Sequence, residues 1–343
     1  MTAQDASLLQ RIAPKAAWAA GREAPPLVSV IVAAHNYGRF LTTCLSSVAG
    51  QTYTKLECVV VDDCSTDDTF EVANGMAKAF SDRRYIVVRN RTNIGQLASQ
   101  STGLTHCHGV FVVFLDADDV LAPTFLERHL FAQLNSKLSA ALSVSDQITI
   151  DGSGVVHSGS RLDYGALSEV TTAEHIEIAG TEDNPALRAV FLPWSDAATH
   201  ASHSWYWQTQ SAMMFRRALL DLIVPPPTEC AAFRICSDFY LARFGHLIAN
   251  SMILLEVLGG YRQHSANNFA GSSFIATGLQ GGDVRRIPSF DAYKALVRAT
   301  IKQRRDQFDL ALGSDRLSRL EGMLNKTDDD KAAKGLFRSL FGR

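Results

Sequence analysis

The chain lacks the features that direct a protein to nucleic acid, to the cell exterior or across a membrane. Its 33 Lys and Arg are matched by 35 Asp and Glu, so no basic excess favours a nucleic-acid partner. The N-terminus shows no succession of charged region, apolar core and small-residue cleavage site, as a secretory signal has. No uncharged apolar run approaches the roughly 20 residues that span a bilayer. We therefore expect a cytoplasmic protein that does not cross the membrane.

Cysteine pairs are also missing. The six cysteines are dispersed and form no CxxC motif, which argues against a zinc knuckle and against a disulfide framework. We expect reduced thiols, most of them acting as small buried hydrophobic residues. Long disordered tracts are not expected either, because 46% of the 343 residues are hydrophobic. This length suits one elaborated α/β domain or two tightly joined halves.

Strand and helix patterns alternate through the first part of the chain. Short apolar, β-branched runs indicate strands buried on both faces, and apolar residues at helical spacing lie between them. The expected strands cover Val28–Ala34, Leu56–Val61, Tyr85–Val88 and Val110–Leu115, and two of the expected helices cover Asp67–Phe80 and Gly95–Thr105. This alternation predicts an α/β fold with an open, mostly parallel sheet and helices on both faces.

The alternation weakens beyond Leu134. Asp151–Gly154 has the composition of a hairpin turn. Helices are expected near Phe215–Leu222 and Ser237–Phe244, then a strand over Met252–Leu258 and a flexible glycine-rich stretch over Gly271–Gly282.

Acidic residues follow two of the predicted strands. Asp62 and Asp63 come after the second strand, and a group that contains Asp116 and Asp118 follows the fourth. Such clustering is destabilising unless a cation offsets the repulsion, and carboxylate oxygens suit Mg²⁺ or Mn²⁺, which also bind diphosphate. An aspartate after a strand can instead cap the next helix, and Asp119 suits that role. Two such pairs at neighbouring strand ends favour a metal site.

Four segments together resemble family 2 glycosyltransferases of the GT-A fold. They are Ser29–Gly38 (SVIVAAHNYG), Val60–Thr69 (VVDDCSTDDT), Asn93–Gln96 (NIGQ) and Phe114–Asp119 (FLDADD). The resemblance is close over residues 27–135 and looser over 209–268. It implies a Rossmann-like nucleotide-binding N-terminal half joined to an acceptor-binding C-terminal half. It divides the chain into a lead-in (1–26), a nucleotide-sugar-binding half (27–135), an acceptor and catalytic-base half (136–270) and a C-terminal part (271–343).

The resemblance also implies the ligands of the donor, for which UDP is the expected nucleotide. Asp62 or Asp63 would contact the base and ribose, and the Ala33 and His35 backbone would line the base pocket. The other implied nucleotide contacts are Asn36, Tyr37, Asn93, Gly95, Gln96, Asp116 and Ala117. Asp118 is the main candidate to ligate a divalent cation, Mn²⁺ or Mg²⁺, with Asp116 beside it.

Two C-terminal segments supply the remaining chemistry that the resemblance implies. Ser237–Arg243 resembles the helix start whose aspartate is the general base of an inverting transfer, which indicates Asp238; an acid in a first helical turn can also simply stabilise the helix. Tyr261–Asn268 resembles an element whose histidine completes the metal site, which indicates His264. An arginine that approaches phosphate in many family members is absent after Gly95, so more stabilisation of the leaving group would fall to the metal and to Arg262.

The acceptor is the least defined partner. Trp205, Trp207 and Arg262 are candidates to contact a glycan or lipid-linked acceptor, because aromatic faces stack on sugar rings; the tryptophans can equally be core residues. Residues 331–343 place apolar and basic side chains as an interfacial membrane helix does, which predicts peripheral contact with the inner face of a membrane. A terminal helix docked on the domain has the same pattern.

Two rival functions are compatible with some of these residues. Phe114–Val120 resembles the nucleophile loop of haloacid-dehalogenase-like phosphohydrolases, with Asp116 as nucleophile. That reading leaves Asp62 and Asp63 unexplained. The second rival is an inactive nucleotide-binding scaffold. The missing arginine favours it, and so does Ser237, which stands where the family's helix start usually has glutamate. The retained aspartates and His264 favour an active transferase.

Overall fold

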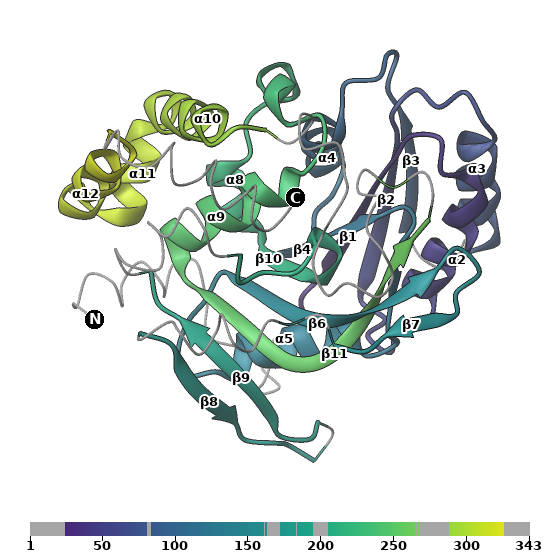
Figure 1. Cartoon of the computed structure of the whole chain (residues 1–343), viewed down its shortest axis with the longest axis horizontal. Helices are drawn as coiled ribbons and strands as arrows, with labels where there is room; N and C mark the ends of the chain where they lie inside the picture. The colour runs from purple at the N-terminus through teal and green to yellow at the C-terminus, as the bar shows by residue number, and fades with distance from the viewer. Residues whose placement is uncertain are drawn as a thin grey trace, which may run out of the picture.

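One sheet joins the two halves of the chain. The computed structural model describes residues 25–80, 84–160, 162, 172–182, 184–194, 205–264, 267 and 288–325. Within these residues, the strands form an 11-stranded sheet in the order β3-β2-β1-β4-β10-β6-β11-β9-β8, with β5 paired to β11 and β7 to β6 (Figure 1). The predicted lead-in helix, the 271–282 stretch and the 331–343 helix lie outside the described residues.

The strands of the first half match the predicted ones to within a residue or two. They are β1 (Val28–Ala34), β2 (Leu56–Asp62), β3 (Arg84–Arg89) and β4 (Phe111–Asp116). All three pairings among them are parallel. The remaining strands are β5 (Val120–Leu121), β6 (Leu142–Asp151), β7 (Val156–Ser158), β8 (Glu174–Ile178), β9 (Leu187–Leu192), β10 (Met213–Arg216) and β11 (Ser251–Gln263).

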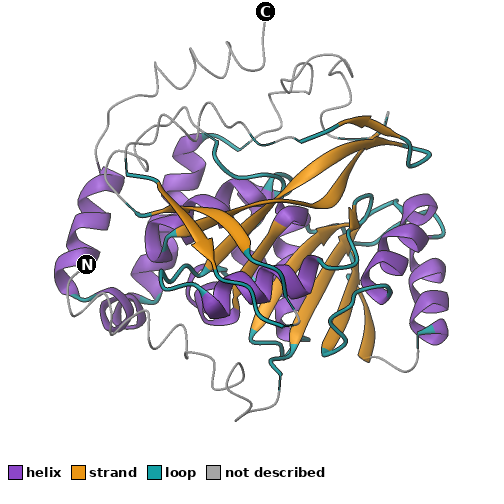
Figure 2. Cartoon of the chain, turned by 90° about the horizontal axis from the view of Figure 1, so that it is seen from below, coloured by secondary structure: helices purple, strands orange, loops and turns teal. Residues whose placement is uncertain are grey.

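Helices cover both faces of the sheet, as predicted (Figure 2). One core packs the helices α4 and α9 against one face, and the other core packs α2 and α5 against the opposite face. The α-helices are α2 (Gly38–Ala49), α3 (Thr69–Ala79), α4 (Gln96–Thr105), α5 (Phe125–Asn135), α8 (Arg217–Ile223), α9 (Ser237–Ala249), α10 (Phe290–Gln303), α11 (Arg305–Leu312) and α12 (Ser314–Asn325). Short 3₁₀ turns cover Gln210–Ala212, Pro227–Glu229 and Ala231–Phe233.

The second half departs from the prediction at three elements. Phe215 lies in β10, not at the start of a helix, because β10 is inserted antiparallel between β4 and β6, where an apolar side chain is buried. Helix α9 continues to Ala249, and β11 continues through Arg262 to Gln263. Strands from both sides of the predicted boundary near residue 135 belong to this one sheet. The predicted hairpin at 151–154 joins β6 to β7.

The C-terminal helices pack beside α8 and α9, at the end of the molecule away from α2 and α3 (Figure 1). The contact is aromatic: the rings of Phe244 and Phe308 stack with centroids 5.7 Å apart, and Tyr293 packs on Tyr240. Among the described helices, none has the length and apolar character needed to cross a bilayer.

Candidate functional site

The predicted site residues gather where β1, β2 and β4 end. Register brings them together, because Ala34 is paired with Asp62 and Ala33 with Asp116 across neighbouring parallel strands. Ala117 follows β4 and is 3% exposed, so its side chain contributes packing. In an open α/β sheet this edge is where ligands bind.

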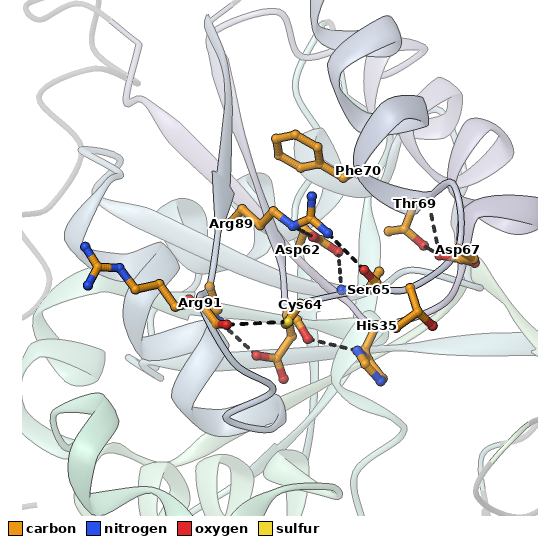
Figure 3. Close-up of polar contacts among 12 residues, drawn as sticks. His35, Asp62, Cys64, Ser65, Asp67, Thr69, Phe70, Arg89 and Arg91 are labelled. Carbon is orange, nitrogen blue, oxygen red and sulfur yellow. Dashed lines mark hydrogen bonds and ion pairs between the residues drawn. The ribbon is translucent and has the colours of Figure 1, made fainter.

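The loop after β2 is braced by a buried carboxylate (Figure 3). Arg89 Nε lies 3.0 Å from Asp62 Oδ2, and its guanidinium covers the ring of Phe70 at 4.7 Å. The Ser65 amide donates to Asp62 Oδ1 at 3.2 Å. The Asp62 side chain has no exposed surface. The carboxylate of Asp62 therefore holds the loop together, and the choice between Asp62 and Asp63 as the nucleotide contact stays a prediction.

Asp63 ties the β2 loop to the segment that precedes α4. Its carboxylate accepts hydrogen bonds from the backbone amides of Ile94 and Gly95 at 2.9 and 2.8 Å and from the Asn90 side chain at 2.9 Å. Gly95 has a φ of 91°, which allows this approach, and a Cβ there would lie 2.6 Å from Arg234 Cα. Two predicted nucleotide-binding segments are thus held as one unit.

His35 and its neighbours fasten the first loop to the second. His35 Nδ1 donates to the Asp63 carbonyl at 2.8 Å, so Nε2 is the unprotonated nitrogen that faces the Asn36 side chain. Asn36 takes a left-handed φ of 62° and accepts the Thr66 amide at 2.8 Å. The Tyr37 amide donates to the Thr69 hydroxyl at 2.9 Å. Of this group the Asn36 side chain is the most exposed.

The segment before α4 also contacts the chain just ahead of α9. Arg234 donates to the carbonyl of Asn93 at 3.1 Å, and the Gln96 amide donates to the carbonyl of Arg234 at 2.9 Å. This contact brings the predicted nucleotide-binding residues beside the helix that carries Asp238.

The two aspartates of the DxD motif point to different partners. Asp116 accepts hydrogen bonds from the amides of Gln96 and Gln210 and from the hydroxyl of Ser211. Burial, followed by the charge of Asp118, raises the pKa of Asp116 well above its ordinary value, while the two glutamines act in the opposite direction.

Asp118 is paired with His264, as a metal site requires. His264 Nε2 lies 3.0 Å from Asp118 Oδ2, and the Asn267 amide lies 3.3 Å from the same oxygen. On the other side of the ring, Arg39 donates to His264 Nδ1 at 3.2 Å. A guanidinium can only donate, so Nδ1 is unprotonated and the ring proton is on Nε2, which donates to Asp118.

These residues fit a divalent cation in part. In the described ranges, no three His, Cys, Asp or Glu side chains gather closely enough to form a complete metal centre. Asp118 and His264 form a two-donor site, and Mg²⁺ and similar ions are often held by one or two protein carboxylates, with phosphate oxygens and water as the other ligands. Binding through Nε2 of His264 requires its proton to move to Nδ1 or to leave the ring.

Arg262 has a different position from the one predicted. Its Nε donates to the Asp118 carbonyl at 2.7 Å, its amide donates to Asp119 Oδ1 at 2.8 Å, and its Nη1 donates to the Asp151 carbonyl at 3.0 Å. The residue is 4% exposed. Arg262 therefore holds the DxD loop onto β11 and is not directed at an acceptor. Asp119, bound to this backbone, likewise supports the loop.

Asp238 stands in the first turn of α9. It is half-buried, and its Oδ1 accepts the Phe239 amide at 2.9 Å. Burial raises the pKa of Asp238 to about 6. A carboxylate in this range is ionised at neutral pH and more basic than an exposed aspartate, as a general base requires.

The two acceptor tryptophans differ in exposure. Trp207 is 3% exposed and donates from Nε1 to the Ser251 hydroxyl at 2.9 Å. It is therefore a core residue, which is the alternative that the sequence had left open for the tryptophans. Trp205 is half-buried and lies parallel to Phe239 with ring centroids 6.4 Å apart. Of the pair, Trp205 is the more exposed, and it packs on Phe239 of the helix that carries Asp238.

Sequence reasoning missed Arg39, Gln210 and Asn267. Arg39 directly follows the segment Ser29–Gly38, and Asn267 lies within Tyr261–Asn268. Their nearness to these two motifs is the signal by which the sequence could have identified them. Gln210 lies at the start of the looser resemblance over 209–268, but no motif singled it out, because its approach to Asp116 depends on the insertion of β10 beside β4.

Comparison with known proteins assigns the family. A family model described as Glycosyl transferase family 2 matches residues 29–165, which include the DxD loop and the braced loops described above. Residues 29–165 belong to glycosyltransferase family 2. The chain is 28% identical over 241 residues to an uncharacterized glycosyltransferase of Nostoc sp., an alignment that covers 70% of this chain and 66% of the relative.

Two further comparisons concern a named enzyme and the fold. Over 144 residues the chain is 29% identical to the UDP-Glc:alpha-D-GlcNAc-diphosphoundecaprenol beta-1,3-glucosyltransferase WfaP of Escherichia coli, covering 41% of this chain and 55% of WfaP. The structure of S. aureus TarS 1–349 in complex with UDP-GlcNAc superposes with a TM-score of 0.52 at 18% identity, covering 91% of this chain and 71% of that one. The fold is GT-A. The alignments to the first curated relatives span 66% of their length or less.

Proposed function

We propose that this protein is an inverting, metal-dependent glycosyltransferase that moves a sugar from a nucleoside diphosphate sugar, with UDP as the nucleotide, to a hydroxyl of a glycan or lipid-linked acceptor. One observation carries the proposal: Asp118 contacts His264, a pair able to ligate a metal, and Asp238 with its raised pKa lies at the start of the helix that Gln96 joins to Asp116. The UDP-Glc donor and lipid-linked acceptor in the name of WfaP support the choice of substrate class.

Asp118 and His264 are the residues that would hold the cation. When bound, a divalent metal neutralises the negative charge that develops on the departing diphosphate. Arg262 and Asn267 keep Asp118 in place, through its carbonyl and its carboxylate respectively. Asp63 and His35 hold the loops that would enclose the base, through the hydrogen bonds described above.

Asp238 would accept the proton of the acceptor hydroxyl. As that oxygen bonds to the anomeric carbon, the bond from this carbon to the diphosphate oxygen breaks on the opposite face, which inverts the anomeric centre. The pKa of about 6 leaves Asp238 mostly ionised at pH 7 without making it too weak a base. Trp205 is the aromatic face that remains available for the acceptor.

The rival functions are less well supported. A phosphohydrolase needs Asp116 free to attack phosphorus, whereas its carboxylate accepts three hydrogen bonds. The retained Asp118, Asp238 and His264 weigh against an inactive scaffold. Phosphatase activity on an aryl phosphate would favour the first rival, and nucleotide binding without turnover of any donor would favour the second.

The metal assignment is tested with Asp118→Asn. We expect the parent to bind UDP in a Mn²⁺-dependent manner by calorimetry and the variant to lose this dependence, because the substitution removes charge but little volume. Asp306→Asn is the matched control, since Asp306 is an exposed acid of α11 far along the chain. Equal Mn²⁺-dependent affinity in parent and Asp118→Asn would refute the assignment.

We also propose a cytoplasmic enzyme that rests on the inner face of a membrane through residues 331–343. The support is the pattern of apolar and basic residues in that segment alone. Truncation after residue 330 should abolish sedimentation with anionic liposomes and leave the melting temperature unchanged. A large fall in melting temperature, with no liposome binding by the intact chain, would show that the segment belongs to the core.

A further inference from the structure

The carboxylate of Asp116 is the centre of a polar network that leads to helix α9, which carries Asp238. Its Oδ1 accepts the Gln96 Nε2 at 2.9 Å and also the Gln210 Nε2, and its Oδ2 lies 3.3 Å from the Ser211 hydroxyl. Gln210 is 2% exposed and Ser211 is fully buried. Three donors surround this carboxylate, and none of them is a metal-ligating group.

The far ends of both glutamine amides meet at one residue, Ser237. The Ser237 backbone amide donates to Gln96 Oε1 at 3.0 Å, and its hydroxyl donates to Gln210 Oε1 at 2.7 Å. Gln100 adds a third contact, donating to Gln210 Oε1 at 2.6 Å. Two amide bridges therefore run side by side from Asp116 to Ser237.

Ser237 is the first residue of α9 and precedes Asp238. The residue before it, Cys236, takes a left-handed φ of 56° and gives the helix no side-chain cap. The first N–H groups of a helix need acceptors from outside the helix. Gln96 supplies one of them from another part of the chain, so the start of α9 depends on this remote acceptor.

Asp116 decides which way both amides face. Its Oδ1 accepts a hydrogen bond from each NH₂ group, which turns both carbonyl oxygens toward Ser237. A reversed Gln96 would place its oxygen against the carboxylate and its NH₂ against the Ser237 N–H, and both contacts are repulsive. A cation on Oδ1 of Asp116 would compete with the two amides that already occupy this oxygen.

We propose that Gln96 and Gln210 are positioning residues that transmit the orientation of Asp116 to the first turn of α9, so that Asp116 aligns the general base while Asp118 serves the metal. This inference rests on the proposed function of the site. It assigns different tasks to the two aspartates of one motif and gives a role to Gln210.

Two measurements on the full chain separate these tasks. The first is Mn²⁺-dependent UDP binding by calorimetry, and the second is hydrogen exchange of the peptide that contains the first turn of α9. Asp118→Asn should lose at least about tenfold in UDP affinity with normal exchange. Asp116→Asn should change UDP affinity by less than about threefold, while exchange of the first turn accelerates by about tenfold or more.

Variants of the bridges test the transmission itself. Gln210→Met should accelerate the same exchange with UDP affinity kept, and where the parent releases UDP from UDP-glucose, the rate should fall by about tenfold at unchanged KM. Gln96→Met should accelerate the same exchange. Gln133→Met is the matched control, because Gln133 is also a buried, hydrogen-bonded amide, bound to Ser143 and Met214. It should leave exchange at the start of α9 unchanged.

The outcomes distinguish failure of this inference from failure of the proposed function. If the parent binds UDP and Asp116→Asn loses that binding as Asp118→Asn does, Asp116 is a ligand and the inference is wrong. It is also wrong if exchange at the start of α9 is unchanged in Asp116→Asn, Gln96→Met and Gln210→Met. If the parent binds no UDP with Mn²⁺, the proposed function fails, and the exchange measurements still decide whether the bridges hold α9.

Discussion

Neutralising Asp238 should lower turnover sharply and stabilise the protein at the same time. Burial raises the pKa of this carboxyl from 3.8 to about 6, so the folded state binds the proton more tightly than the unfolded chain. Ionisation of Asp238 therefore costs stability, beginning above about pH 4 and complete above about pH 6. Asp238→Asn removes that cost and keeps an oxygen for the Phe239 amide.

The magnitude follows from the shift. Two pKa units correspond to about 3 kcal/mol, which is an upper bound because Asp238 is only half-buried. We expect Asp238→Asn to raise the free energy of unfolding by roughly 1–3 kcal/mol at pH 8 and by less at pH 5. Turnover should fall by roughly 10²-fold or more, the range for loss of a positioned general base.

The assay combines urea denaturation at pH 5 and pH 8 with the pH dependence of turnover. In the parent, activity should rise with pH through about 6 and then level off, because only the ionised carboxylate accepts a proton. Asp291→Asn is the control, since Asp291 lies in the first turn of α10 and is exposed. Its neutralisation should cost a few tenths of a kcal/mol.

The opposite sign would refute this reasoning. An aspartate that merely complements the helix macrodipole stabilises the fold when charged, so its neutralisation costs about 0.3–1 kcal/mol. If Asp238→Asn loses stability as Asp291→Asn does and keeps nearly full turnover, the base lies elsewhere. Glu229 and Asp221 would be the next residues to test.

Two further substitutions probe the ligand and the loops. Arg39→Met should raise the affinity for Mn²⁺ in the absence of nucleotide by up to roughly tenfold, as measured by titration. The reason is that Nδ1 of His264 can then take the ring proton, which frees Nε2 to bind the metal. A lower affinity would show instead that Arg39 holds His264 in place as a metal ligand. Gly95→Ala should lower the free energy of unfolding by more than Gly313→Ala in urea denaturation and should weaken UDP binding. Both glycines have positive φ, which costs about 1 kcal/mol for alanine, but only at Gly95 does a Cβ also meet backbone; equal losses would contradict the clash.

The sequence by itself determined the likeness of residues 29–165 to glycosyltransferase family 2, the parallel half of the sheet and the edge at which its acidic residues lie. Apolar, β-branched runs such as Val28–Ala34 can only be buried on both faces, and acids directly after such strands must meet at one edge. Both are local properties of the chain, and the register pairs Ala34 with Asp62 and Ala33 with Asp116 at that edge. The segment that carries His264 was also identified from its own residues.

Tertiary structure alone decided what each polar group at that edge touches. Insertion of β10 beside β4 brings Gln210 to Asp116, and β11 carries Arg262 under the DxD loop, across separations of 94 and 144 residues. Burial of Trp207 and the raised pKa of Asp238 likewise depend on what other segments place around them. The sequence around a polar residue limits the chemistry that its side chain can perform. Hydrogen bonds and desolvation act through space, so the bonding partner and the protonation state of that side chain are fixed only when distant segments pack around it.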